Sequence, residues 1–196
     1  MRFISSSCTF ILLFTLSSLG QLPPKTRQES EQACIASLSG FPKGASLIPK
    51  PPFPSDSNGI TLEYFASECL GNCPAFTLTI SENVARFDGH AYVRAKGKRT
   101  AKLTHQEFEG FLHAWYEGNF YAMRDNYCGI TCPDGTQILV LDNAESSIRL
   151  TTPTFTKQVY ECFSTVNNQP QTPKPPEQYY DLVRQLWAFA KAKHWL

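Results

Sequence analysis

Residues 69–81 read CLGNCPAFTLTIS, and this stretch decides the fold. From Phe76 to Ser81, apolar and hydroxyl side chains alternate without a break, which is the pattern of a β-strand with one buried face. Before the strand, Gly71 and Pro74 disfavour a helix and favour a tight turn. A turn can bring two α-carbons within the roughly 4.4–6.8 Å that a disulfide needs. The stretch therefore predicts a strand entered from a turn that carries the cysteine pair Cys69 and Cys73.

The two-residue period continues on both sides of this strand. The expected strands cover residues 60–64, 76–81, 84–88, 91–96, 136–141 and 146–150. Asp88-Gly89 is a hairpin signal between the third and fourth of them, and we expect Asp142-Asn143 to join the last two. Consecutive strands joined by short turns predict an antiparallel sheet of about five to six strands.

Three other segments carry a helical period. Thr104 and Glu107 form a capping box, in which each side chain satisfies a backbone N–H at the start of a helix. Apolar residues then recur at i, i+3, i+4 and i+7, namely Phe108, Phe111, Leu112 and Trp115. We expect a second helix over about 152–166 and a third over about 177–193. The predicted fold class is α+β, an antiparallel sheet packed by two to three helices and stapled by disulfides.

The first twenty residues have the features of a signal peptide. Arg2 supplies a positive charge, residues 10–16 are apolar, and Ser18-Leu19-Gly20 presents small residues, so we expect cleavage before Gln21. A short buried N-terminal helix is the alternative. A membrane-spanning helix needs roughly 20 apolar residues, and this run is shorter. We therefore expect an exported protein, periplasmic or secreted, with no transmembrane anchor.

Proline-rich segments suggest where the chain after residue 20 divides into an arm and a domain. Residues 21–58 are expected to form an N-terminal arm that ends in a proline-rich connector, and residues 59–196 a single α+β domain. The whole chain has 18 Lys and Arg against 17 Asp and Glu, so the loss of Arg2 leaves it formally neutral. Nucleic-acid binders usually show a basic excess, and we expect no nucleic-acid partner.

Six cysteines remain after the signal peptide, an even number that predicts three disulfides in an exported chain. Two C-x3-C pairs, each followed by proline, suggest the pairings Cys69–Cys73 and Cys128–Cys132, which leaves Cys34–Cys162. Six cysteines allow 15 connectivities, so this set is a hypothesis. The alternatives are a tetrahedral zinc site built from the two pairs and a thiol-redox site.

Two other groups of residues could carry function. The basic run Arg94, Lys96, Lys98, Arg99 and Lys102 could meet an anionic surface, or its cations could protect an edge strand against aggregation. Asp125 and Asp134 flank the second cysteine pair and could act as paired carboxylates, or they could simply form turns. The chain has no nucleophile-elbow, zinc-helix or phosphate-loop motif, and we expect no catalytic, cofactor or metal residue.

From Ile60 to about Trp195 the chain resembles DUF6438, a bacterial family of exported or cell-envelope proteins classified as a domain of unknown function. The resemblance rests on a C-x-G-x-C-P-x-[YF] pattern at residues 69–76, on Phe87-Asp88-Gly89 and on Lys96-Gly97-Lys98. It implies that Cys69 and Cys73 act as a pair and that the second cysteine pair is an addition of this protein. It implies no activity and no catalytic residue.

The leading hypothesis is a non-catalytic exported module that binds a protein or a cell-envelope component or supports the envelope, because every distinctive residue has an adequate structural role. The second is a thiol-redox or metal-binding protein that uses the C-x3-C pairs. The third is a secreted enzyme or enzyme inhibitor with a site around Asp125 and Asp134.

Overall fold

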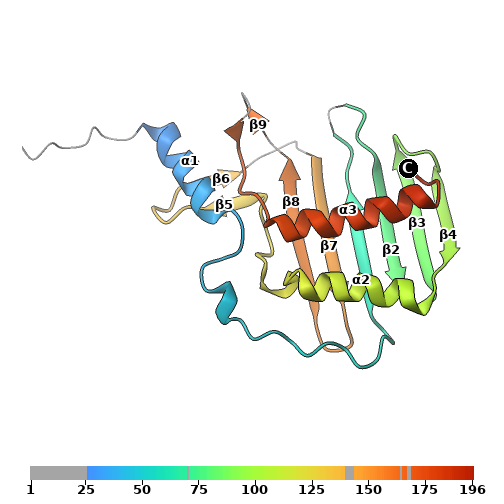
Figure 1. Cartoon of the computed structure of the whole chain (residues 1–196). Coiled ribbons are helices and arrows are strands. Elements are labelled where there is room, and N and C mark those ends of the chain that lie inside the picture. Colours follow the sequence, from blue (N-terminus) through green and yellow to red (C-terminus); the bar gives the residue numbers. More distant parts are fainter. Residues whose placement is uncertain (1–25, 70, 140–143, 164, 167–168) are drawn as a thin grey trace, which may run out of the picture.

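A computed structural model describes residues 26–69, 71–139, 144–163, 165–166 and 169–196. One six-stranded antiparallel sheet, in the order β4-β3-β2-β1-β7-β8, dominates the fold (Figure 1). Its strands in chain order are β1 (Thr61–Ala66), β2 (Ala75–Ser81), β3 (Val84–Ala91), β4 (Gly97–Lys102), β7 (Ala144–Thr151) and β8 (Thr156–Phe163). The pairs β5 (Gly129–Thr131) with β6 (Gln137–Leu139) and β9 (Thr165–Val166) with β10 (Gln169–Pro170) form two small sheets.

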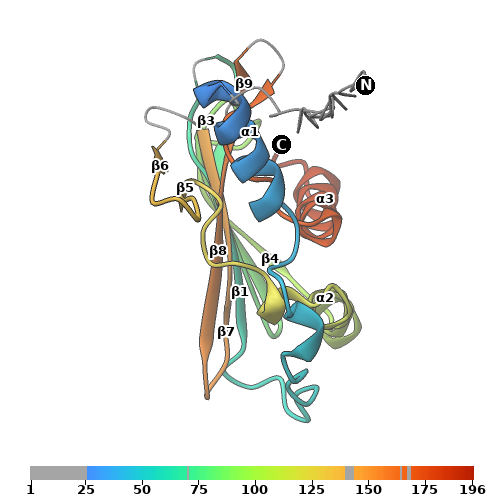
Figure 2. The ribbon, with the colours of Figure 1, turned by 90° about the vertical axis from the view of Figure 1, so that its left-hand side faces the viewer.

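Three α-helices accompany the sheet, and the predicted α+β class is confirmed. They are α1 (Arg27–Leu38), α2 (His105–Glu117) and α3 (Glu177–Ala192), with short 3-10 helices η1 (Ala45–Leu47) and η2 (Phe120–Ala122). Helices α2 and α3 lie side by side on one face of the sheet, and the hairpin β5–β6 lies on the other side (Figure 2). The main core fills the space between these two helices and the sheet.

Side-chain alternation explains why helices α2 and α3 cover only one face of the sheet. In β1 the side chains of Leu62, Tyr64 and Ala66 are buried, whereas the intervening positions are partly exposed. The same alternation in β2 directs Thr77, Thr79 and Ser81 away from the helices. Antiparallel sheets commonly keep one solvated face, and this open face is polar because its strands carry threonines and charges there.

Helix α2 forms as the sequence predicts. Thr104 accepts from the backbone N–H of Glu107, and the Glu107 carboxylate accepts from the N–H of Thr104, which completes the capping box. The predicted stripe of Phe108, Phe111, Leu112 and Trp115 is buried, and Gly118 caps the end. The last helix also lies where it was expected, over Glu177–Ala192.

Three details of the prediction were wrong. The segment expected to form a helix over 152–166 contains β8 instead, which pairs antiparallel with β7. Asp88-Gly89 lies inside β3, and the strand expected over 91–96 does not form, because the chain turns over residues 92–96 before β4. The strand near 136–141 pairs as β6 with β5, not with the strand that follows it. Asp142-Asn143 lies outside the described residues.

The six cysteines form three disulfides, two of which differ from the expected pairing. Cys69–Cys73 is confirmed, with α-carbons 5.6 Å apart. The other bridges are Cys34–Cys132 and Cys128–Cys162. Cys128–Cys132 cannot form because β5 occupies the three residues between them, and four residues of extended chain span about 13 Å. Cys34 therefore pairs with Cys132, and Cys162 with Cys128.

The N-terminal arm contains a helix that periodicity did not predict. Helix α1 starts at a capping box of Thr26 and Glu29 and is tied to the β5–β6 hairpin by the Cys34–Cys132 bridge. The Tyr127 hydroxyl donates to the Gly40 carbonyl at 2.8 Å, which fixes the chain after the helix. The expected signal peptide lies outside the described residues, and no described helix is long and apolar enough to cross a membrane.

Candidate functional site

The five cations of the sequence's basic run gather along one edge of the sheet. Arg94 and Lys96 lie in the turn between β3 and β4, and Lys98, Arg99 and Lys102 lie in β4, the terminal strand of the sheet. All five side chains are exposed. Within the described residues none of them forms an ion pair. We name these five residues the basic edge.

A groove on the open face adjoins the basic edge. Its volume is about 480 Å³, and it is lined by Thr77, Thr79, Arg86, Phe87, Asp88, Lys98, Arg99 and Thr100. Arg86 lies directly opposite Thr100, and Asp88 directly opposite Lys98, across the β3–β4 pair. Three of the lining side chains are cationic and one is anionic, so the groove favours a ligand that carries negative charge together with hydrogen-bonding groups.

The sequence pattern identified the basic edge but missed the rest of the groove. Arg86, Thr77 and Thr79 come from two other strands, and their closeness to Lys98 depends on the strand register. One sequence feature does indicate part of the groove. The alternation of apolar and hydroxyl residues in β2 places Thr77 and Thr79 together on the polar face of the sheet.

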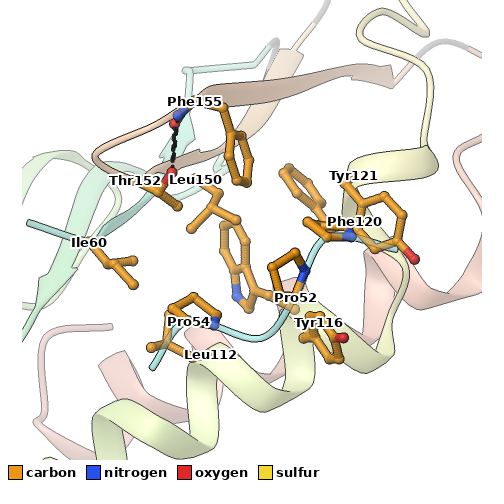
Figure 3. Close-up of a pocket in the computed structure, with 12 residues that line it drawn as sticks. Pro52, Pro54, Ile60, Leu112, Tyr116, Phe120, Tyr121, Leu150, Thr152 and Phe155 are labelled. Carbon is orange, nitrogen blue, oxygen red and sulfur yellow. Dashed lines mark hydrogen bonds between the residues drawn. The ribbon is translucent and has the colours of Figure 1, made fainter. Parts of the chain in front are cut away.

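A second cavity is apolar and small. It lies between the proline-rich connector, helix α2 and the turn that joins β7 to β8, and Figure 3 shows its rings and aliphatic groups converging. It is lined by Pro51, Pro52, Pro54, Ile60, Leu112, Trp115, Tyr116, Phe120, Tyr121, Leu150, Thr152 and Phe155. Thr152 and Phe155 are hydrogen-bonded to each other, since the Phe155 N–H donates to Thr152 Oγ1 at 3.1 Å and the Thr152 N–H donates to the Phe155 carbonyl at 2.8 Å.

The size of the apolar cavity limits its use. Its volume is about 50 Å³, whereas small-molecule sites usually measure about 300–1,000 Å³. The connector closes over it because Phe53 stacks on His113 at 4.3 Å and the ammonium of Lys50 lies 3.8 Å from the centre of the Tyr116 ring. We interpret it as a packing gap beneath the connector.

Besides the groove and the apolar cavity, the structure contains a buried carboxylate, that of Glu161, beneath helix α3. Glu161 is 3% exposed, and its carboxylate accepts from the hydroxyls of Tyr180 and of Ser146, the latter at 3.3 Å. Ser146 Oγ is also 2.9 Å from the Tyr179 hydroxyl. Burial raises the pKa of Glu161 to about 7, although the two hydrogen bonds pull it downward. No sequence motif marks this group of residues.

Burial also raises the pKa of the tyrosines that lie near Glu161. It raises the pKa of Tyr64 to about 12 and the pKa of Tyr179 well above its ordinary value, and the nearby Glu161 charge adds to both shifts. These two phenols therefore stay protonated at ordinary pH. Glu161 is 3% exposed and is not among the residues that line the groove, the apolar cavity or the cavities at Asp125 and Asp134, so this cluster differs from an exposed catalytic pair.

Asp125 and Asp134 do not share a cavity. Asp125 lines one with Met123, Arg124 and Asn126 and pairs with Lys157. Asp134 lines another with Arg27 and Glu31. Asp134 accepts from the N–H of Thr136 at 2.9 Å, and this hydrogen bond lowers the pKa of its carboxyl. The two carboxylates therefore have separate partners, and each sits in a turn or beside one.

The cysteines that could have formed a zinc or thiol site are the disulfide partners described above. Among the described residues, no group of three or more His, Cys, Asp or Glu is placed to hold a metal ion. The two C-x3-C pairs also differ in structure, because only Cys69 and Cys73 bond to each other.

Comparison with known proteins places the fold in a family. A search of curated proteins found no match to this chain. The family model of DUF6438, a domain of unknown function, matches residues 60–170, more than half of the chain. This region starts one residue before β1 and ends with β10, so it contains all six strands of the main sheet. The chain belongs to the DUF6438 family.

Proposed function

We propose that this protein is an exported, non-catalytic binding module that contacts an anionic partner, a protein or a cell-envelope component, through the basic edge. The observation that carries the proposal is the set of five exposed cations with no ion pair among the described residues. Two exposed cations elsewhere, Arg27 and Arg184, are by contrast paired with carboxylates in their own helices. Unpaired cations on one edge leave a local positive field in a chain that is formally near neutral.

Export is supported by the apolar N-terminal run and by the three disulfides, since disulfides persist in oxidising compartments. Binding is favoured over catalysis because the most perturbed carboxylate, Glu161, lies buried, and because Asp125 and Asp134 lie apart. The groove beside the basic edge is lined mostly by polar and charged residues, as expected for a surface that contacts a charged partner.

The test compares the protein from Gln21 onward with a variant in which Lys98, Arg99 and Lys102 are changed to Gln. The probes are poly-L-glutamate, an acidic polysaccharide and vesicles that contain anionic phospholipid, each at two salt concentrations. We expect at least one probe to bind, to bind more weakly at high salt, and to lose about tenfold or more in affinity with the variant. The control carries Arg27→Gln, Lys43→Gln and Arg184→Gln, which remove the same number of charges at three exposed positions outside the basic edge.

Two results would contradict the proposal. One is the absence of binding to all three probes at low salt. The other is equal loss of binding in the edge variant and in the control, because it would show that overall charge, and not the basic edge, attracts the probe. Folding of each variant is checked by its unfolding midpoint, which we expect to be unchanged because all the altered side chains are exposed.

The thiol and metal alternative has its own measurement, the intact mass of the exported protein before and after reduction and alkylation. We expect a chain that begins at Gln21 and takes up alkylating reagent only after reduction. Alkylation without reduction, or zinc in the native mass, would return the C-x3-C pairs to consideration as a site.

A further inference from the structure

The two edge strands of the main sheet, β8 and β4, differ in the partners of their outward backbone groups. On β8 the Tyr160 N–H donates to the Asp125 carbonyl, and the Tyr160 carbonyl accepts from the Tyr127 N–H, both at 2.9 Å. The Cys162 carbonyl accepts from the Thr172 hydroxyl at 2.9 Å, and the Cys128–Cys162 bridge lies at the same end. Three outward backbone groups of this edge strand, the N–H and C=O of Tyr160 and the C=O of Cys162, are therefore occupied by other segments of the chain.

The other edge strand, β4, forms no backbone hydrogen bond to a further segment within the described part of the chain. The Leu103 N–H donates to the Asn83 carbonyl directly after the paired region, so Leu103 and every second residue before it point their backbone groups toward β3. The intervening residues Lys98, Thr100 and Lys102 must then point their N–H and C=O groups outward. An independent contact agrees, because the Lys98 carbonyl accepts from the Arg99 guanidinium of its own strand at 2.8 Å.

Charge narrows the class of partner that this edge can accept. The side chains of Lys98, Thr100 and Lys102 lie on the open face beside Arg86, and Arg99 adds a further cation. A second copy of β4 would bring like charges opposite each other, which destabilises strand pairing. A strand with a carboxylate at every second position would place its negative charges against these cations. Asp88 is the one carboxylate in the groove, and it lies on the inner side of Lys98.

We propose that β4 binds an extended acidic peptide by strand addition, with the backbone of Lys98, Thr100 and Lys102 supplying the hydrogen bonds and the basic edge supplying the charge. This inference rests on the proposed function and names the partner of the same surface. The backbone pairing gives affinity that does not depend on side chains, and alternate side chains of the peptide enter the groove on the open face. A polysaccharide or a lipid headgroup would use the charge but not the outward backbone groups.

The test uses a fluorescently labelled peptide of about eight residues in which Glu and Thr alternate, long enough to cover β4. Two isomers carry N-methyl groups on one or the other alternate set of amides, so they share composition and charge. Strand addition needs only the amides that face β4. We expect one isomer to bind like the unmethylated peptide and the other to bind at least about tenfold more weakly, because several hydrogen bonds are lost.

Hydrogen exchange supplies the matching readout on the protein. On binding the unmethylated peptide, the amides of Lys98, Thr100 and Lys102 should become protected, whereas those of Arg99 and Ala101 should change little because they already bond to β3. Equal binding of both methylated isomers, or no alternation in protection, would overturn strand addition and leave the proposed function standing as a purely electrostatic contact. Failure of the peptide while anionic vesicles or the polysaccharide bind has the same meaning. Failure of every anionic probe removes both proposals.

Discussion

Glu161 is the residue whose setting departs most from the ordinary. A carboxylate that is 3% exposed is held here by hydroxyl groups, with Tyr180 and Ser146 as donors and Tyr179 next to Ser146. Lys174 is the cation whose charge acts on it, and its side chain is exposed. Burying a charged carboxylate costs free energy, so the neutral form is favoured in the folded protein and the pKa rises.

The raised pKa makes stability depend on pH with a definite sign. The pKa of Glu161 is about 7 in the folded protein against 4.5 for an unperturbed glutamate, so between these values the folded state holds more protons than the unfolded state. The free energy of unfolding should therefore fall as pH rises from 4.5 through 7, by on the order of 3 kcal/mol. Glu161→Gln stays neutral, and we expect it to flatten this decline in denaturant unfolding measured from pH 5 to 8.

Glu68→Gln is the control, since Glu68 is exposed just after the end of β1. It should retain the decline of the unaltered protein. Glu107 and Asp134 do not confuse the result, because backbone hydrogen bonds lower the pKa of each, and their stabilising effect is lost only below the ordinary carboxyl range. An identical decline in the Glu161→Gln variant would show that another group is responsible.

Glu161 also explains why strand β8 could not be predicted from the sequence. In β8 two of the positions that face the helices, Lys157 and Glu161, are charged, and they lie on either side of the buried Val159. Apolar alternation is thereby lost, and the remaining apolar residues mimic a helical stripe. By contrast, β1, β2, α2 and α3 keep a clean period or a capping box, and the sequence predicts them well.

The candidate site was predictable only where its residues are neighbours in the chain. The basic edge is contiguous in sequence and could be identified, whereas its groove needs the β2–β3–β4 register, which no local pattern contains. The disulfides divide in the same way. Cys69–Cys73 closes a local turn, while Cys34–Cys132 and Cys128–Cys162 depend on how β5 and α1 pack.

Two glycines test whether these elements are built as described. Gly110 lies in α2, and the space that a Cβ would take there is open, so Gly110→Ala should stabilise the protein by about 0.5–1 kcal/mol. Gly89 lies in β3, where a Cβ would come 2.2 Å from the Ala95 carbonyl oxygen, so Gly89→Ala should destabilise it by about 1–3 kcal/mol. Denaturant unfolding of both variants measures the two effects, and shifts of the same sign would contradict the described β3–β4 connection.

At the scale of the whole molecule, the disulfides join parts that the sheet does not. Cys34–Cys132 ties α1 to the β5–β6 hairpin across 98 residues, and Cys128–Cys162 ties the start of that hairpin to β8. Backbone contacts add to this, since the Gly40 N–H donates to the Lys174 carbonyl at 2.7 Å. The arm is thus attached to the sheet, although it lies before the family region.

The stability that is lost when a single disulfide is removed should increase with the length of the loop that the disulfide closes. In the chain-entropy account, loss of Cys34–Cys132 costs about 5 kcal/mol and loss of Cys69–Cys73 about 2 kcal/mol. We expect the Cys34→Ser, Cys132→Ser variant to unfold at a clearly lower denaturant concentration than the Cys69→Ser, Cys73→Ser variant. Peptide mapping without reduction should first recover the three bridges. The reverse order of stability would mean that the long bridge mainly fixes local shape.

The Cys34–Cys132 bridge also changes what a protease can do to this protein. The proline-rich connector between η1 and β1 runs outside the sheet, and a protease could cut it there. Both sides of such a cut remain joined by sulfur, because Cys34 lies before the connector and Cys132 after it. A nicked molecule would migrate as one band without reductant and as two with it. The protein would thus keep its mass, and helix α1 with it, after its backbone has been broken.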